Sequence, residues 1–589
     1  MERTIGARAR VKYSQQMQFG PLKTRRTLLG LGSALLLAWC AGMFARGYWT
    51  PDEPREADIA WRMSWQADEA VPLLAGEAFC EKPPLTYWLA AIPIRWFSAQ
   101  AWAARLPNLL YAFITALGVG LLASRSAGRF AGLVGAAAIS TFLLSYQVAI
   151  WLATDAPLLA AVSVALLGAY IGFYATTRAQ RLRGYLLMHT ALGLGFLSKS
   201  AVAWMVPAMA LLTLCIWEKR WRELLRWELY IGLLIQAAMI LTWVWFVYRG
   251  SDGAEHLRIF FWNNLVGRFA PVDAPPDLQY AAAHRNTPGK YLIELPVYLF
   301  PWTLLVIAAA RRAWRQRRAL RDQRAVRFAL AASLPPLLLL SFAATARNIY
   351  LAPALPGFAL LLAWWAREIL PGPDRWDVRA LRATAAMLLL GVALFVAALI
   401  VIAGDSGSSA KPVPYIAISA IGLLAAAVLA LRAWAAARDQ PVHAQWALLL
   451  AYCALLIGPA SQVYTQVDRW QDLAKISREV AADAAGKPLI LLAPDETTRA
   501  MIDMYARQSV DRITGPLDIA GIGRIHAMAA AAPDSRFLVL LPAQSPRLPW
   551  RRRAPEMGVP PAWAGAGFRI AKSYSLPNGR RYALLEVTP

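Results

Sequence analysis

The sequence predicts an all-α polytopic membrane protein with a small soluble α/β domain at its C-terminal end. Of the 589 residues, 58% are hydrophobic and only 16% are charged, whereas a soluble protein of this length needs more charge to cover its surface. The apolar residues come in blocks of about 20, each long enough to cross a bilayer. From residue 463 onward, the composition changes to that of a soluble domain.

Reading the apolar blocks in order predicts about thirteen transmembrane helices. The first block follows a basic stretch and lacks a small-residue cleavage site, so we expect an uncleaved first span. A shorter segment, residues 85–97, is expected to lie along the membrane interface, with its aromatic residues at headgroup depth. The predicted spans are 27–47, 102–124, 128–147, 154–175, 184–198, 201–217, 228–248, 291–310, 328–345, 349–366, 384–403, 415–435 and 444–462.

The positive charges predict the orientation of these spans. If the basic segment 1–26 is cytoplasmic, every further loop assigned to the inside is also basic, including the arginine-rich stretch 311–327. An odd number of spans then puts the C-terminus in the periplasm. The net charge of +25 is explained by this topology, with anionic membrane lipids as secondary partners, so we predict no nucleic-acid partner.

The segment 463–589 predicts a small periplasmic α/β domain. "KPLILLAP", "SRFLVLLP" and "RRYALLEV" are typical of short strands, and "TTRAMIDMYARQ" of a helix between strands. The segment has no Gly-rich phosphate loop and no pattern of a catalytic triad. We expect a lid or a partner surface, and a merely stabilising cap is an equal alternative.

The predicted topology gathers charged side chains at the periplasmic ends of the spans. The two long periplasmic loops, 48–101 and 249–290, carry many of them. Charged residues at the rim of apolar helices are costly unless they face a cavity or a partner, which makes them functional candidates.

Several short motifs on this face carry a family resemblance. In order they are "DE" at 52–53, "KPPLTYW" from Lys82, "TDAP" with Asp155, "GFLSKS" with Lys199, "NNLVGRF", "LFPW" and "RNIYLAPALP". The sequence resembles the GT-C class of glycosyltransferases that use polyprenyl-phosphate sugars. Within that class it most resembles the bacterial lipid A 4-amino-4-deoxy-L-arabinose transferases. The resemblance implies that residues 27–462 form a GT-C catalytic domain.

The resemblance implies an inner-membrane enzyme that moves 4-amino-4-deoxy-L-arabinose from an undecaprenyl phosphate donor to a lipid A phosphate on the periplasmic face. A related transferase acting on protein or another glycan is an alternative, and so is a flippase or transporter of lipid-linked sugars. Transporters often contain internal repeats, which this sequence lacks. The periplasm excludes ATP and nucleotide sugars, so we expect no nucleotide cofactor.

Such a reaction needs cations, because the departing phosphate gains negative charge in the transition state. The structural alternative for each cation is a long side chain that reaches from an apolar helix to the interface. The donor-phosphate candidates are Lys82, Lys199, Arg268, Arg347 and, as a hydroxyl donor, Tyr350.

Asp52 is the predicted catalytic carboxylate, with Glu53 as the alternative. The resemblance implies that an acidic residue of the first loop acts as general base or orients the acceptor. The helix pattern "TPDEPREADIAWRM" offers a structural explanation for the neighbouring acids, because Thr50 could cap a helix whose first turn is acidic. That alternative treats Glu56 and Asp58 as parts of an interfacial helix.

Glu81, Asp155 and His284 predict a candidate metal site. Two nearby carboxylates repel one another unless a cation lies between them, and a divalent ion could bridge them to the lipid phosphate. Salt bridges to lysine and arginine are the alternative.

The stretch before "RF" departs from the resembled family, which usually carries an acidic residue and a histidine where this chain has Asn263 and Asn264. The identity of the sugar therefore stays open at this point.

Overall fold

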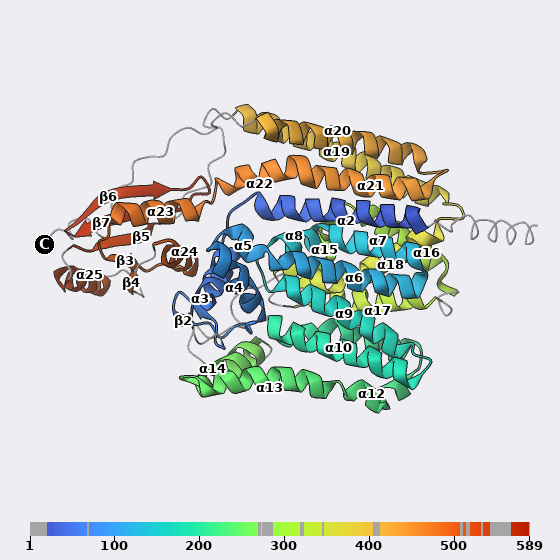
Figure 1. The fold of residues 1–589 in the computed structure, drawn as a ribbon, viewed down its shortest axis with the longest axis horizontal. Coiled ribbons are helices and arrows are strands. Elements are labelled where there is room, and N and C mark those ends of the chain that lie inside the picture. Colours follow the sequence, from blue (N-terminus) through green and yellow to red (C-terminus); the bar gives the residue numbers. More distant parts are fainter. Residues whose placement is uncertain are drawn as a thin grey trace, which may run out of the picture.

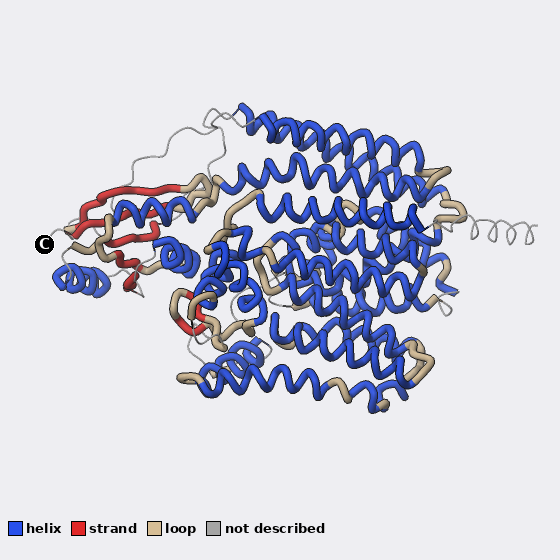
Figure 2. Tube along the Cα trace, in the orientation of Figure 1, coloured by secondary structure: helices blue, strands red, loops and turns tan. Residues whose placement is uncertain are grey.

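The computed structural model describes residues 21–66, 70–268, 272–273, 287–318, 323–343, 347–404, 413–506, 510–513, 519–531, 534–541 and 567–587. Long helices lie side by side in a bundle at one end of the molecule, and a β-sheet with its helices forms the other end (Figure 1). Between the two lies a compact region of short elements that belongs to the first predicted periplasmic loop (Figure 2).

The bundle confirms a multi-pass helical membrane protein. Eight helices among the described residues are long and apolar enough to cross a membrane, or up to ten if each of two bent pairs is one span. All the predicted spans overlap helices, but their exact number stays a prediction. The helices are α2 Pro21–Phe44, α6 Pro107–Ala127, α7 Arg129–Thr141, α8 Leu143–Ile150, α9 Asp155–Phe173, α10 Arg178–Lys199, α11 Val202–Trp217, α13 Leu233–Arg249, α15 Lys290–Tyr298, α16 Thr303–Arg315, α17 Arg324–Ser341, α18 Leu355–Glu368, α19 Arg375–Gly404, α20 Val413–Ala436, α21 Pro441–Leu455 and α22 Ser461–Asp468.

Two of the predicted spans are bent helix pairs. The angle is 65° between α7 and α8, and 113° between α15 and α16. The two breaks are joined by hydrogen bonds: the Leu143 N–H donates to the Phe300 carbonyl at 2.8 Å, and Trp302 Nε1 donates to Thr141 Oγ1 at 2.8 Å. Backbone and side-chain polar groups freed by one break are thus satisfied at the other, as an apolar interior requires.

Small residues bring α9 and α10 into close contact. A Cβ added at Gly184 would lie 2.4 Å from the Gly172 nitrogen, and one added at Gly168 would lie 2.6 Å from the Gly184 carbonyl oxygen. Glycine at these positions lets the two backbones touch, as is common between membrane helices. This close packing sets the relative position of the N-terminus of α9 and the C-terminus of α10, which carry Asp155 and Lys199.

The first loop folds into short elements whose acidic residues are buried. The residues Glu53, Glu56 and Asp58 are no more than 4% exposed, and no side chain caps the start of α3. The explanation of these acids as a capped interfacial helix is therefore wrong, since each carboxylate has buried partners instead. The elements are α3 Asp52–Met63, β1 Leu73–Leu74, β2 Glu77–Ala78, α4 Leu85–Phe97 and α5 Ala101–Arg105.

The C-terminal region contains the predicted small α/β fold. Its five-stranded sheet has the order β4-β3-β5-β7-β6, in which β3 is parallel to β4 and β5, and β7 is antiparallel to β5 and β6. The three predicted strands and the predicted helix are confirmed. The elements are α23 Leu473–Ala484, β3 Leu489–Leu492, α24 Glu496–Ala506, β4 Val510–Ile513, α25 Ile519–Ala531, β5 Arg536–Leu541, β6 Phe568–Ser575 and β7 Arg581–Val587.

The C-terminal fold and the first loop share one hydrophobic core. Ile59 and Met63 of α3 are buried in the same cluster as Met501 of α24 and Leu489 of β3. Burial of apolar surface stabilises by about 25 cal/mol per Å², so a core of this kind holds the two parts together. The division of the chain at residues 462 and 463 stays a prediction.

Candidate functional site

Helix α3 contributes the predicted catalytic residue, Asp52, to the candidate site from its first turn. Asp52 and Glu56 are four residues apart and therefore lie on one face of the helix. The Asp52 carboxylate accepts a hydrogen bond from Arg347 Nη1 at 2.7 Å, and its side chain is 24% exposed. Arg347 precedes the short helix η7 Asn348–Ala354, which leads into α18. The side chain of Arg347 is 42% exposed, so this pair stays accessible to a ligand.

Glu56 forms the second ion pair of this face. Its carboxylate is buried and accepts a hydrogen bond from Lys82 Nζ. Burial alone would lower the pKa of Lys82, but the charge of Glu56 outweighs it and raises the pKa above its usual value. Lys82 is therefore a cation held in place beside α3.

Asp155 and Lys199 form the third pair. Lys199 Nζ donates to Asp155 Oδ2 at 2.5 Å, and the same ammonium lies 4.6 Å from the centre of the Tyr350 ring. Asp155 begins α9 and Lys199 ends α10, so the close packing of those helices brings the pair together. Asp155 Oδ1 is buried without a partner.

The three pairs belong to one site. Burial opposes the charge of Arg347, but Asp52, Tyr350 and Glu81 all favour it, so its pKa is raised. Glu81 also favours the charged form of Lys82, and its backbone carbonyl accepts a hydrogen bond from Asn264 at 2.6 Å. The predicted residues that the structure brings together are Asp52, Glu81, Lys82, Asp155, Lys199, Arg347 and Tyr350.

The positions of two predicted site residues cannot be compared with this cluster. The side chain of Arg268, at the end of the short helix η3 Val266–Arg268, lies outside the described residues, and so does the whole of His284. Among the residues that the structure does describe, no group of three or more His, Cys, Asp or Glu side chains could hold a metal ion. Asp155 is bound to Lys199, which is the salt-bridge alternative. The described residues therefore do not support the metal site.

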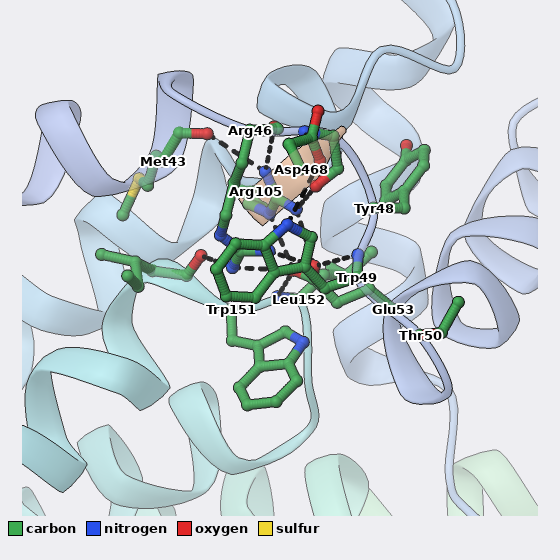
Figure 3. A network of polar contacts seen from close by, with 12 residues as sticks. Met43, Arg46, Tyr48, Trp49, Thr50, Glu53, Arg105, Trp151, Leu152 and Asp468 are labelled. Carbon is green, nitrogen blue, oxygen red and sulfur yellow. Dashed lines mark hydrogen bonds and ion pairs between the residues drawn. The ribbon is translucent and has the colours of Figure 1, made fainter. Parts of the chain in front are cut away.

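Glu53 has a different environment from Asp52, although it is the next residue. Its carboxylate accepts hydrogen bonds from Arg105 Nε at 2.8 Å and Nη2 at 2.7 Å, and from the Leu152 N–H at 2.9 Å (Figure 3). Burial raises the pKa of Glu53, but Arg105 and Arg46 outweigh it and hold the pKa below its usual value. Glu53 is fully buried and has its acceptors occupied, so it is a structural anion and not an alternative to Asp52.

The partners of the candidate residues are not evident from the sequence. The structural alternative treated Glu56 as part of an interfacial helix, although its spacing of four from Asp52 places both carboxylates on one face of that helix. Arg46 and Arg105, which hold Glu53, lie at the predicted periplasmic ends of two spans, where basic residues are less common than at cytoplasmic ends. Their position was therefore a signal in the sequence that the set of candidate residues did not use.

Known proteins resemble this chain in sequence and in fold. A family model described as dolichyl-phosphate-mannose-protein mannosyltransferase matches residues 81–246. The undecaprenyl phosphate-alpha-4-amino-4-deoxy-L-arabinose arabinosyl transferase of Pseudomonas aeruginosa strain UCBPP-PA14 is 30% identical over 456 residues, which cover 73% of this chain and 75% of that protein. The chain belongs to this arabinosyl transferase family.

A further relative is similar in sequence, and two solved structures are similar in fold. The transferase of the same name from Yersinia enterocolitica serotype O:8 / biotype 1B is 29% identical over 379 residues, covering 62% of this chain and 64% of its own. The crystal structure of ArnT from Cupriavidus metallidurans in the apo state matches with a TM-score of 0.69 at 16% identity, over 95% of this chain and 98% of that chain. Its structure bound to undecaprenyl phosphate matches with a TM-score of 0.68.

Family membership confirms the resemblance and the fold class deduced from the sequence. The chain is a membrane glycosyltransferase with the GT-C fold of the family. It is a multi-pass protein of the inner membrane.

Proposed function

We propose that the protein transfers 4-amino-4-deoxy-L-arabinose from an undecaprenyl phosphate donor to a phosphate of lipid A, on the periplasmic face of the inner membrane. The cluster of three carboxylate–cation pairs, formed by the first loop, by the residue before η7 and by the ends of α9 and α10, carries the proposal. A lipid-linked phosphate needs cations at the membrane surface and apolar helices below it. The names of the relatives supply the sugar and the lipid carrier.

In the proposed reaction an oxygen of the acceptor phosphate attacks the anomeric carbon of the sugar. The bond between that carbon and the donor phosphate oxygen breaks, and undecaprenyl phosphate leaves with one more negative charge. Lys82, Lys199 and Arg347 would bind this phosphate, because each ammonium or guanidinium has N–H donors beyond the one its carboxylate uses. Stabilising the charge that develops on the leaving group lowers the barrier.

Asp52 would act on the acceptor side. An ionised phosphate is already a nucleophile, so Asp52 would orient it or bind the sugar's amino group. If the acceptor phosphate still carries a proton, Asp52 would accept it. The observation that favours Asp52 over Glu53 is access: Asp52 is partly exposed with one ion pair, whereas Glu53 is enclosed by two arginines.

Transfer onto protein is the second candidate, because the family model that matches residues 81–246 is described as a protein mannosyltransferase. The purified protein, reconstituted with undecaprenyl phosphate-aminoarabinose, would be offered lipid A or an unfolded polypeptide, and the products analysed by mass spectrometry. We expect the sugar on lipid A and none on the polypeptide. Sugar on the polypeptide alone would establish the second candidate, and donor translocation without any product would indicate a flippase.

A further inference from the structure

The segment that connects α2 to α3, residues 45–51, is held by side chains from the other end of the chain. Thr465 Oγ1 donates to the Ala45 carbonyl at 3.0 Å. Asp468 Oδ1 accepts from the Gly47 N–H at 2.8 Å and from Trp49 Nε1 at 3.2 Å. Figure 3 shows Asp468 above Trp49 and Glu53. The segment therefore has partners more than 400 residues away along the chain.

Gln471 and Thr497 hold the last two residues before Asp52. Gln471 Oε1 accepts from the Thr50 N–H at 3.2 Å and from Thr50 Oγ1 at 3.0 Å. Thr497, in the first turn of α24, donates from Oγ1 to the Pro51 carbonyl at 3.3 Å. These contacts fix the backbone that enters α3, whose start has no side-chain cap of its own. A helix start without a cap frays easily, and Asp52 is the first residue of this one.

The rest of α3 is fastened to the same C-terminal fold. Arg62 Nη2 donates to Asp503 of α24 at 2.5 Å, and Arg55 lies 2.7 Å from Glu496. The apolar face of α3 shares its core with α24. A lid that opens would have to break this core and these pairs together. The contacts therefore favour a fixed support over a moving lid.

We propose that the segment from α22 to α24 positions the Asp52 carboxylate, and that Gln471 and Asp468 are positioning residues for transfer. The inference rests on the proposed function, which gives Asp52 its role. Gln471 touches neither the three ion pairs nor Asp52 itself. It acts through Thr50 by fixing the backbone that enters α3, so the direction of the Asp52–Arg347 pair follows from it.

The test compares two variants of Gln471 whose new side chains are similar in length to glutamine. Gln471→Met removes the accepting oxygen, and Gln471→Glu keeps it. For Gln471→Met we expect kcat to fall by roughly ten- to a hundredfold, as a displacement of about 1 Å does, with unchanged KM for the donor and an unchanged melting temperature. Gln471→Glu should retain kcat within about threefold. Asp534→Asn, at an exposed residue just before β5, is the control and should behave as the wild type.

Each other outcome counts against the inference. Wild-type kcat in Gln471→Met, an equal loss in Gln471→Glu, or a loss of kcat that only follows a lowered melting temperature would overturn it. The double variant with Asp52→Asn separates the two proposals, since a residue that acts through Asp52 adds no further loss once that carboxylate is gone. If Asp52→Asn is itself fully active, the catalytic assignment fails. If Asp52→Asn is inactive while Gln471→Met is normal, only the positioning inference fails.

Discussion

At the scale of single residues, the site consists of cations that are each held by a carboxylate. Asp52, Glu56 and Asp155 bind Arg347, Lys82 and Lys199 respectively. The excess of acidic residues at the mouth of the first span of a basic protein follows from this arrangement. An unpaired lysine beside apolar helices would lose its charge or turn toward the solvent. A lysine that is paired with a carboxylate stays charged and keeps its position in the site.

The first prediction concerns Asp52. Asp52→Asn keeps the shape of the side chain and removes its charge, so we expect expression and donor binding near wild type and a reduction of transfer by orders of magnitude. The measurement is transfer from the polyprenyl-phosphate donor to purified lipid A. Glu53→Gln is no suitable control, because Glu53 supports the fold. Wild-type turnover in Asp52→Asn would show that the wrong carboxylate has been chosen.

The second prediction concerns the two lysines. Lys82→Ala and Lys199→Ala each remove a charge-assisted contact to phosphate, which is worth about 1.5–3 kcal/mol, or roughly ten- to a hundredfold in kcat/KM for the donor. Initial rates at limiting donor measure the effect. Lys475→Ala, at an exposed lysine of α23, is the control and should leave the rate unchanged. Full activity of both variants would refute the assigned role.

At the scale of elements, the sequence predicted the existence of α3 and misjudged its surroundings. Its pattern of acids is compatible with a solvated helix. Several partners of those acids are distant along the chain: Lys82 is 26 residues from Glu56, Arg105 is 52 from Glu53, and Ala75 is 17 from Asp58. Hydrophobic periodicity predicts only which residues share a face of one helix. It does not predict which distant residues the tertiary fold brings next to that face.

The third prediction uses Asp58, which joins α3 to the hairpin β1–β2 through the Ala75 N–H and to α24 through Arg62. Burial raises the pKa of Asp58 to about 7, although Arg62 favours the charged form. Between about pH 4 and 7 the folded protein then binds more protons here than the unfolded chain does. The free energy of unfolding should therefore fall as pH rises through this window and level off above it.

Asp58→Asn removes this titrating group, so its melting temperature should depend less on pH between 5 and 7 than that of the wild type. Thermal unfolding of both proteins in detergent, at several pH values, measures the difference. Asp534→Asn, at an exposed residue just before β5, is the control for ordinary carboxylates. Equal slopes for Asp58→Asn and the wild type would contradict the prediction.

At the scale of the whole molecule, the amino-acid composition and the length of the apolar blocks were sufficient to predict the fold class. Apolar blocks identify membrane helices because the bilayer demands length and hydrophobicity, and short apolar runs identified three strands of the C-terminal sheet. The bends at α7–α8 and α15–α16 could not be predicted. They depend on hydrogen bonds between the two breaks, such as that of Leu143 with Phe300, and neither partner signals the other in the sequence.

The last prediction tests the orientation that all site assignments assume. With the basic loops inside, a reporter enzyme that is active only outside the cytoplasm should work when fused after Pro589. It should fail when fused within residues 311–327, because that arginine-rich stretch resists transfer across the membrane. A reporter that is active only in the cytoplasm, placed at the same two positions, should give the opposite pattern. The reverse result with both reporters would put Asp52, Lys82 and Lys199 on the cytoplasmic side, where the proposed periplasmic transfer could not use them.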